Sequence, residues 1–206
     1  GIQRYRGYSI EDLAKNADFL EVAFLLIFGE LPTKNQLKKL IADIQDNAII
    51  DEDLKKILVS FPRSAHPMGI LSSLTSALIA FNPEKKISLT KKTGDEHAYM
   101  YNLIVKLLAK IPILVACVYR RRNGLSLDYG DYTQGYVENV TKMMFQRPNQ
   151  KYIKNDVIVN AMNKLLILHA DHEQNCSTST VRIVGSSEAS LFASVSAGIS
   201  ALWGRL

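Results

Sequence analysis

The sequence predicts an all-α protein, and three observations support that prediction. Apolar residues recur at steps of three and four through most of the 206 residues, which is the spacing of one face of a helix. Convincing alternation of apolar and polar residues is absent, so we expect no β-structure beyond a short β-like segment at the N-terminus. The sequence contains neither an internal repeat nor a glycine-rich phosphate loop. About nine or ten helices are therefore expected.

Capping residues, glycines and prolines divide the chain into these helices. Side chains that accept a hydrogen bond from a first helical turn predict where helices begin, and Gly or Pro predicts where they end. The first expected helix covers residues 14–28, after the N-cap Ser9 and up to Gly29; the second begins with a capping box at Thr33 and Gln36, and the third covers residues 52–60 and is capped by Asp51. The next helix begins at Pro67, and a long one covers residues 98–121, bends at Pro112 and ends at Asn123-Gly124. A further helix runs from Asp131 to Pro148, and another is capped by Asn155. Residues 82–94 are expected to form a polar, lysine-rich loop, and His66 is interpreted as a capping or packing residue.

The C-terminal region is rich in Ser, Ala and Gly. Gly185 and Gly198 fall within small-residue helices, where glycine more often allows close helix packing than it touches a ligand. The last helix is expected to bury one stripe of residues and to end at Trp203, the stripe being Phe192, Val195, Ile199 and Leu202.

The composition is that of a globular protein with a sizeable core, since 47% of the residues are hydrophobic and 22% are charged. Two well-separated cysteines, Cys117 and Cys176, provide no disulfide framework, which favours a reducing compartment. No signal peptide or uninterrupted apolar span is recognised, so a cytoplasmic protein with no membrane segment is expected. The net charge of +5 indicates an anionic partner. Basic residues are scattered apart from short clusters such as Arg120–Arg122, and we interpret them as solvated surface, with no nucleic acid bound.

The candidate site lies where an apolar helix runs into a polar cluster. A buried helical stripe is expected to end in a histidine, its members being Ile158, Ala161, Met162, Leu165, Leu166 and His169. His172 follows one turn later. Imidazole N–H groups suit recognition of a carboxylate or keto oxygen. A single histidine on an apolar face, such as His169, is more often a core residue whose hydrogen bonds are satisfied. Here the polar neighbours favour a binding site; they are Asp171, Glu173 and Asn175. A metal site is the third interpretation, with His169, His172, Glu173 and Cys176 as its ligands. The spacing of these residues matches no familiar zinc motif.

The run HADHEQNCSTSTVRIVGSS, followed by ASLFASVSAGISALWG, closely resembles bacterial (type II) citrate synthase. Matches at RYRGYSIEDLA, GELPT, AHPMGIL and MMF extend the resemblance nearly from end to end. The resemblance implies that residues 1–206 are part of the multi-helical large domain, with the small domain and the C-terminal segments absent. It also implies an acyltransferase that condenses acetyl-CoA with oxaloacetate and water to give citrate and CoA, the first step of the tricarboxylic acid cycle. No metal or other cofactor is implied.

The resemblance carries over to individual residues. His172 matches a family histidine that binds oxaloacetate, Asn175 matches a nearby polar contact, and His169 is a weaker candidate for the same pocket. The catalytic His, His and Asp of the family would follow Leu206. No catalytic residue is therefore expected within this chain, and the chain alone is predicted to be inactive.

Assembly and regulation are implied as well. The family forms dimers through packed antiparallel helices, here those opened by Pro67, Ala98 and Ser177, and its type II members often form hexamers. Members inhibited by NADH carry an Arg-His-Thr-Met run, and the matching positions here are Asp46-Asn47-Ala48-Ile49, which predicts weak or absent inhibition. Two alternatives stay open: 2-methylcitrate synthase, which uses propionyl-CoA, and a non-catalytic helical interaction module whose His/Glu cluster is structural or binds zinc.

Overall fold

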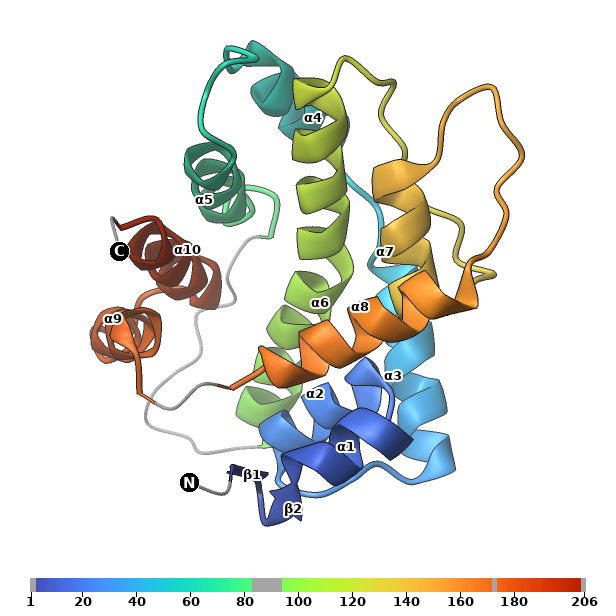
Figure 1. The fold of residues 1–206 in the computed structure, drawn as a ribbon. Helices are drawn as coiled ribbons and strands as arrows, with labels where there is room; N and C mark the ends of the chain where they lie inside the picture. Colours follow the sequence, from blue (N-terminus) through green and yellow to red (C-terminus); the bar gives the residue numbers. More distant parts are fainter. Residues whose placement is uncertain (1–2, 83–93, 172–173, 205–206) are drawn as a thin grey trace. The chain divides into compact units, whose positions relative to one another are not determined.

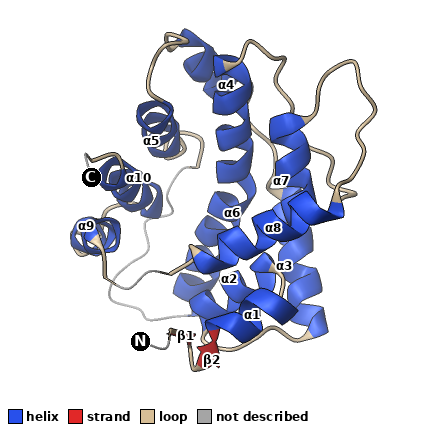
Figure 2. Cartoon of the chain, viewed as in Figure 1, coloured by secondary structure: helices blue, strands red, loops and turns tan. Residues whose placement is uncertain are grey.

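The computed structural model describes residues 3–82, 94–171 and 174–204 (Figure 1). These residues form ten helices and one two-stranded antiparallel hairpin (Figure 2), which confirms the predicted all-α class and the short N-terminal β segment. The elements are β1 Arg4–Tyr5, β2 Tyr8–Ser9, α1 Ile10–Asn16, α2 Phe19–Phe28, α3 Lys34–Asp46, α4 Glu52–Ser60, α5 Pro67–Ala77, α6 Gly94–Arg122, α7 Tyr136–Phe145, α8 Asp156–Leu168, α9 Cys176–Gly185 and α10 Leu191–Leu202. Most of the polar loop expected at 82–94 falls outside the described residues.

The chain divides into two compact units, each described by itself. Unit 1 comprises residues 1–45 and 130–173, and unit 2 comprises residues 46–129 and 174–206.

Local capping explains most of the helix boundaries. The side chains of Ser9, Thr33, Asp51 and Asn155 each accept a hydrogen bond from a backbone N–H in the first turn of the helix that follows. These bonds satisfy donors that a helix cannot pair internally. Gly29 ends α2 in the left-handed region, with φ of 91°. These predicted boundaries are therefore confirmed.

The single helix predicted over residues 14–28 is wrong, because the chain breaks at Ala17 and Asp18 and forms α1 and α2. Glu21 Oε2 accepts a hydrogen bond of 2.8 Å from the Asp18 N–H, which starts a new helix. The side-chain amide of Asn163 on α8 bonds to backbone groups on both sides of this break. Its Oδ1 accepts from the Phe19 N–H at 2.8 Å, and its Nδ2 donates to the Ala17 carbonyl at 3.1 Å. A residue far along the chain thus stabilises a break that local periodicity does not show.

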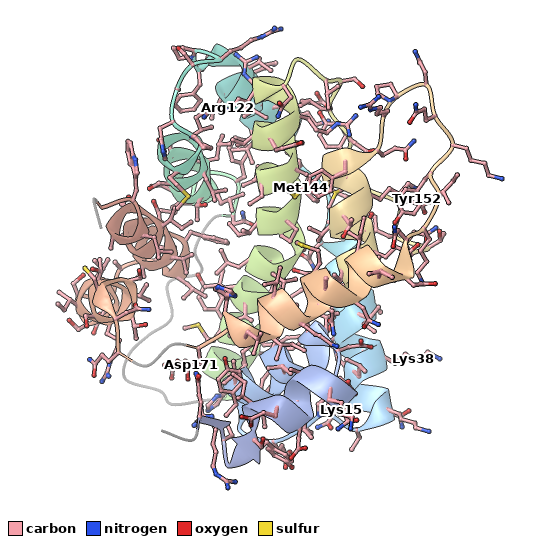
Figure 3. The ribbon with its side chains drawn as sticks, in the orientation of Figure 1. Lys15, Lys38, Arg122, Met144, Tyr152 and Asp171 are labelled. Atoms are coloured by element: carbon pink, nitrogen blue, oxygen red, sulfur yellow. The ribbon has the colours of Figure 1, made fainter. Side chains whose placement is uncertain are left out.

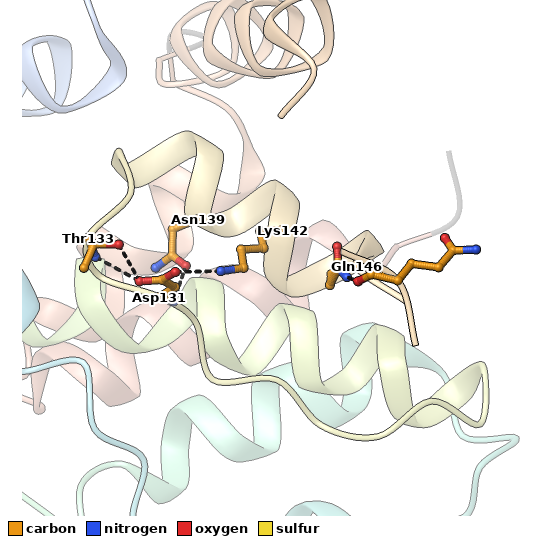
Figure 4. A network of polar contacts seen from close by, with 6 residues as sticks. Asp131, Thr133, Asn139, Lys142 and Gln146 are labelled. Carbon is orange, nitrogen blue, oxygen red and sulfur yellow. Dashed lines mark hydrogen bonds and ion pairs between the residues drawn. The ribbon is translucent and has the colours of Figure 1, made fainter. Parts of the chain in front are cut away.

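Helix α7 begins at Tyr136, five residues later than predicted from Asp131. Asp131 instead forms a polar network in the preceding turn (Figure 4). Its carboxylate accepts from the Lys142 Nζ at 2.7 Å and from the hydroxyl of Thr133 at 2.6 Å, while its N–H donates to Asn139 Oδ1 at 2.8 Å. The hydrogen bonds from Lys142 and then Thr133 hold the pKa of Asp131 well below its usual range.

In unit 1, α8 packs against α1, α2 and α7. The buried core cluster consists of Tyr5, Ile10, Leu13, Val22, Leu25 and Ile167. The buried stripe predicted for α8 is wrong: Ile158 is 47% and Leu165 48% exposed, and the helix buries Asn163 and Ile167 instead. These two residues are four apart and share one helical face, so that face is the one that unit 1 covers.

In unit 2, α10 lies between α9 and α5 (Figure 1). Small residues make this packing close. A Cβ added at Gly198 would lie 2.6 Å from Val181 Cγ2 on α9, which confirms that this glycine allows helix packing. On the other side, the Ser72 hydroxyl lies 3.0 Å from the Ser196 hydroxyl and 2.6 Å from that of Ser200.

The stripe predicted for α10 is partly wrong. Phe192 is buried as predicted, but Leu202 is exposed, and the other buried positions are Ser194, Ser196 and Gly198. Because neighbouring helices approach α10 on two sides, small side chains are buried where large apolar ones do not fit.

Helix α6 runs through Pro112 without interruption. Arg120 in its last turn is buried and donates from Nε to the Ser126 carbonyl, so the solvated interpretation is wrong for this residue. Its neighbour Arg121 donates from Nη2 to the Val59 carbonyl at 2.6 Å. These two arginines therefore connect α6 to the loop that follows it and to α4.

Among the described helices, only the span Glu96–Arg122 of α6 is long and apolar enough to cross a membrane by length and composition. A central core helix passes the same test. Leu103, Val105, Ile113 and Cys117 on this helix are buried within the chain. The length and composition of α6 alone therefore do not identify it as a membrane segment.

Candidate functional site

The C-terminal end of α8 carries the first predicted site residue. His169 is the C-cap; its N–H donates to the Leu165 carbonyl at 3.0 Å, and its ring Nδ1 lies 2.7 Å from the same oxygen. A carbonyl only accepts, so Nδ1 must carry a proton in this contact. The ring can then donate to another oxygen only from a protonated Nε2, as an imidazolium. The ring is exposed, so the predicted core position of His169 is wrong.

The second candidate, His172, and its neighbour Glu173 lie outside the described residues. Asn175 is the N-cap of α9, and its Oδ1 accepts from the Thr178 N–H at 2.9 Å. This bond occupies the amide oxygen and leaves the Nδ2 group as the donor that Asn175 can offer to a ligand. His169 belongs to unit 1 and Asn175 to unit 2.

The hairpin at the N-terminus holds the end of α8, a role that sequence reasoning missed. The Tyr5 hydroxyl lies 3.0 Å from the carbonyls of both Ile167 and Asp171, and Gln3 Nε2 donates to the Asp171 carbonyl at 2.9 Å. Asp171 lies beside this hairpin in Figure 3. Burial raises the pKa of the Tyr5 phenol, which further favours the neutral hydroxyl that can donate a hydrogen bond. The only sequence signal was the aromatic RYRGY segment itself.

His66 both caps and packs, as interpreted from the sequence. Its Nδ1 accepts from the Met68 N–H at 3.3 Å, which caps α5. Its ring stacks on Trp203, with centroids 4.9 Å apart and planes inclined by 14°. A Cβ at Gly69 would lie 3.2 Å from the Trp203 ring, so glycine provides the space for this stack.

Metal ligation was the third interpretation of the His/Glu cluster. The part of the chain that the structure describes contains no group of three or more His, Cys, Asp or Glu side chains that could hold a metal ion. Two of the four suggested ligands, His172 and Glu173, are not among the described residues. Cys176 is an exposed free thiol, and Cys117 is a buried free thiol whose pKa is raised by burial to about 12.

A cavity of about 430 Å³ in unit 1 is lined by residues at or near the N-terminal ends of α2, α7 and α8 and by Leu37 and Ile41 of α3. Its buried carboxylate, Glu138, lies 3.3 Å from the Lys154 Nζ, which also lies 3.1 Å from the Asp156 carboxylate. Lys154 thus neutralises a carboxylate that would be costly to bury alone. None of the predicted site residues lines this cavity.

Comparison with known families and sequences gives one consistent result. All of residues 1–206 match the family model for the citrate synthase C-terminal domain. Citrate synthase of Corynebacterium glutamicum is 46% identical over 211 residues, and citrate synthase 1 of Mycobacterium tuberculosis is 45% identical over 206 residues. Each match covers 100% of this chain and 46% of the relative, so the chain spans about half the length of the relatives it matches.

Solved structures agree with the sequence comparison. The crystal structure of citrate synthase from Pyrobaculum aerophilum superposes with a TM-score of 0.90 at 32% identity. The ternary complex of Thermoplasma acidophilum citrate synthase with carboxymethyl coenzyme A and oxaloacetate superposes with a TM-score of 0.85 at 25% identity. Both matches cover 99% of this chain and 50% of the solved chain.

Proposed function

The chain belongs to the citrate synthase family, and from that membership we propose that the protein condenses acetyl-CoA with oxaloacetate and water to give citrate and CoA. The observation that carries the proposal is the match of all 206 residues to the family, with 46% identity to a citrate synthase. The solved relative that holds oxaloacetate and a coenzyme A derivative supports the choice of substrates.

The proposed reaction needs a base, a polarised ketone and water. A base removes a proton from the thioester methyl group, and the resulting enol carbon attacks the keto carbon of oxaloacetate to form citryl-CoA. Water then cleaves the thioester and releases the CoA thiol. Transition-state charge builds up on the keto oxygen, where hydrogen-bond donors stabilise it. The proposed reaction uses no metal and no redox cofactor.

The residues of this chain serve in binding. His172 would hold oxaloacetate, with Asn175 contributing its Nδ2 donor. His169 would donate to a carboxylate only as an imidazolium, because its Nδ1 proton is directed to the Leu165 carbonyl. The general base and the remaining substrate contacts would come from family residues that this chain does not include.

The test is the release of CoA by the full-length protein, with acetyl-CoA and propionyl-CoA compared at saturating oxaloacetate. We expect faster turnover of acetyl-CoA and a loss of at least about a hundredfold in His172→Ala. His97→Ala, which removes an exposed histidine of α6, is the matched control and should retain activity. Faster turnover of propionyl-CoA would identify a 2-methylcitrate synthase. Bound zinc with no oxaloacetate-dependent rise in melting temperature would favour the interaction module.

This chain by itself should release no CoA above the background of its own His172→Ala variant. The expectation follows from the proposal that the catalytic His, His and Asp lie outside residues 1–206, and measurable turnover by the purified 206-residue chain would contradict it.

A homodimer, or a hexamer built from dimers, is part of the same proposal. None of the residues of α9 is buried within the chain, and its Ile183 is 71% exposed. The Ser72, Ser196 and Ser200 contacts already use part of the small-residue surface inside one chain, which leaves the outer face of α9 for a partner. Ile183→Glu in the full-length protein should shift its mass in light scattering toward the monomer. An unchanged mass would exclude α9 from the interface.

Regulation by NADH should be weak. Residues 46–49 carry one acid and no base, with Ile49 exposed, so they offer no cation to a dinucleotide phosphate. Titration of the full-length enzyme with NADH should leave its rate nearly unchanged, whereas strong inhibition would refute the proposal.

A further inference from the structure

The hydroxyl of Tyr5 is a polar group inside an apolar core. Tyr5 is 1% exposed, and its hydroxyl oxygen lies within hydrogen-bond distance of three carbonyls at or just beyond the end of α8: Ile167 at 3.0 Å, Leu168 at 3.4 Å and Asp171 at 3.0 Å. The same oxygen lies 3.3 Å from the Asp171 N–H. One side chain of β1 therefore contacts the last turn of α8 and the residue three positions beyond its end.

These contacts resolve into one consistent set of bonds. A hydroxyl has a single proton, so it cannot donate fully to all three carbonyls. If the Tyr5 O–H donates to the Ile167 carbonyl, the Asp171 N–H donates to the Tyr5 oxygen, and Gln3 Nε2 donates to the Asp171 carbonyl at 2.9 Å. Each of these backbone groups then has a partner, and the Ile167 carbonyl, which also accepts from the Ala170 N–H at 3.2 Å, has two.

The effect of this arrangement is to fix the backbone where α8 stops. Helix ends fray because their terminal groups are unpaired. Here the carbonyl of Ile167 and both backbone groups of Asp171 are bound to the N-terminal hairpin. His172 is the next residue in the chain.

We propose that Tyr5 is a positioning residue for substrate binding, because it holds the backbone at Asp171, the residue that precedes the proposed oxaloacetate ligand His172. The inference rests on the proposed function and adds to it a residue that does not touch the substrate. Gln3, which donates to the Asp171 carbonyl from the position just before β1, contributes in the same way.

The hairpin supplies a matched pair of variants. Tyr5 pairs with Tyr8 across the two strands, and Tyr8 is 44% exposed. Tyr5→Phe and Tyr8→Phe each remove one hydroxyl and keep the aromatic ring, so core packing is preserved in both. Only the first change removes bonds to the end of α8. Gln3→Ala serves as a second variant that leaves the core untouched.

The experiment measures KM for each substrate, and oxaloacetate affinity by calorimetry, in the full-length protein. Tyr5→Phe should raise KM and Kd for oxaloacetate by about five- to tenfold, the effect of one lost hydrogen bond of typical strength, while KM for acetyl-CoA changes by less than about twofold. Gln3→Ala should shift oxaloacetate binding in the same direction by less, and Tyr8→Phe should match the wild type. In a His172→Ala background, Tyr5→Phe should weaken oxaloacetate binding no further, because the two residues act through one contact.

A purely structural role would give a different pattern. Tyr5→Phe would then lower the melting temperature while leaving oxaloacetate affinity equal to that of Tyr8→Phe, and that result overturns the inference even though the wild type makes citrate. Equal and additive losses in the presence and absence of His172 would overturn it as well. If the wild-type protein neither binds oxaloacetate nor makes citrate, the proposed function fails first and the inference fails with it.

Discussion

Gly198 on α10 is the position where one added methyl group should disturb the helix packing of unit 2. Its Cβ would lie 2.6 Å from Val181 Cγ2, whereas non-bonded carbon atoms prefer about 3.5–4.0 Å. A shift of about 1 Å is therefore needed. Valine has one strongly preferred rotamer in a helix, so its side chain cannot easily turn aside. Gly198→Ala should push α9 and α10 apart.

The net effect combines two opposing contributions. Overpacking a close contact costs about 1–3 kcal/mol, and replacing Gly by Ala inside a helix returns about 0.5–1 kcal/mol. We expect Gly198→Ala to lower the free energy of unfolding by about 0.5–2 kcal/mol. Gly185→Ala is the control, because its Cβ would make an ordinary contact of 3.7 Å with Ser194 Oγ, and it should be neutral or slightly stabilising.

The assay is urea denaturation of the full-length protein, followed at equilibrium for both variants. Val181→Ala removes the methyl group that Gly198→Ala would strike, so the double variant should be more stable than the sum of the two single changes predicts. If Gly198→Ala behaves like Gly185→Ala, and Val181→Ala does not alter its effect, the close approach of the two helices is refuted.

Three further predictions concern buried and charged groups. Asn163→Ala should lower the free energy of unfolding by about 2–4 kcal/mol, because two backbone groups at the α1–α2 break lose their partner. Asn160 is exposed on the same helix, so Asn160→Ala should change the free energy of unfolding by less than about 0.5 kcal/mol. Equal effects of the two changes would contradict the role of the Asn163 amide. A maleimide at pH 8 should label the native protein at Cys176 and not at Cys117, whose pKa is raised to about 12 by burial; mass spectrometry showing both labelled would refute this. The lowered pKa of Asp131 adds stability that is complete above pH about 4 and is lost as the pH falls below it. The free energy of unfolding of the wild type should therefore decline more than that of Asp131→Asn between pH 7 and pH 3. Parallel declines in the two proteins would exclude the effect.

Helix boundaries were predictable where their cause is local. The caps Ser9, Thr33, Asp51 and Asn155 bond to backbone groups two or three residues away, so a short window of sequence contains both partners. The break between α1 and α2 was not predictable in this way. One of its partners, Asn163, is 144 residues from the N–H it binds.

The face that a helix buries is harder to predict than the helix. In α8 apolar side chains occur on more than one side, and several are exposed, including Val157, Ile158 and Leu165. A 3.6-residue period is then present on two faces, and the sequence alone does not select between them. The same ambiguity explains why His169 was predicted to be buried although the structure exposes it.

Polar groups explain how α8 is nevertheless held in one orientation within unit 1. Asn163 binds the break between α1 and α2, and the Ile167 carbonyl one turn later accepts from Tyr5, 162 residues earlier in the chain. Apolar contacts are non-directional and would tolerate a rotation of the helix about its axis. A rotation that separated either pair would leave buried donors and acceptors unsatisfied, which costs more than the bond itself contributes when made. The hydrogen-bonding groups of Asn163 and Tyr5, more than the apolar pattern, therefore specify which way the end of α8 and its C-cap His169 face within unit 1.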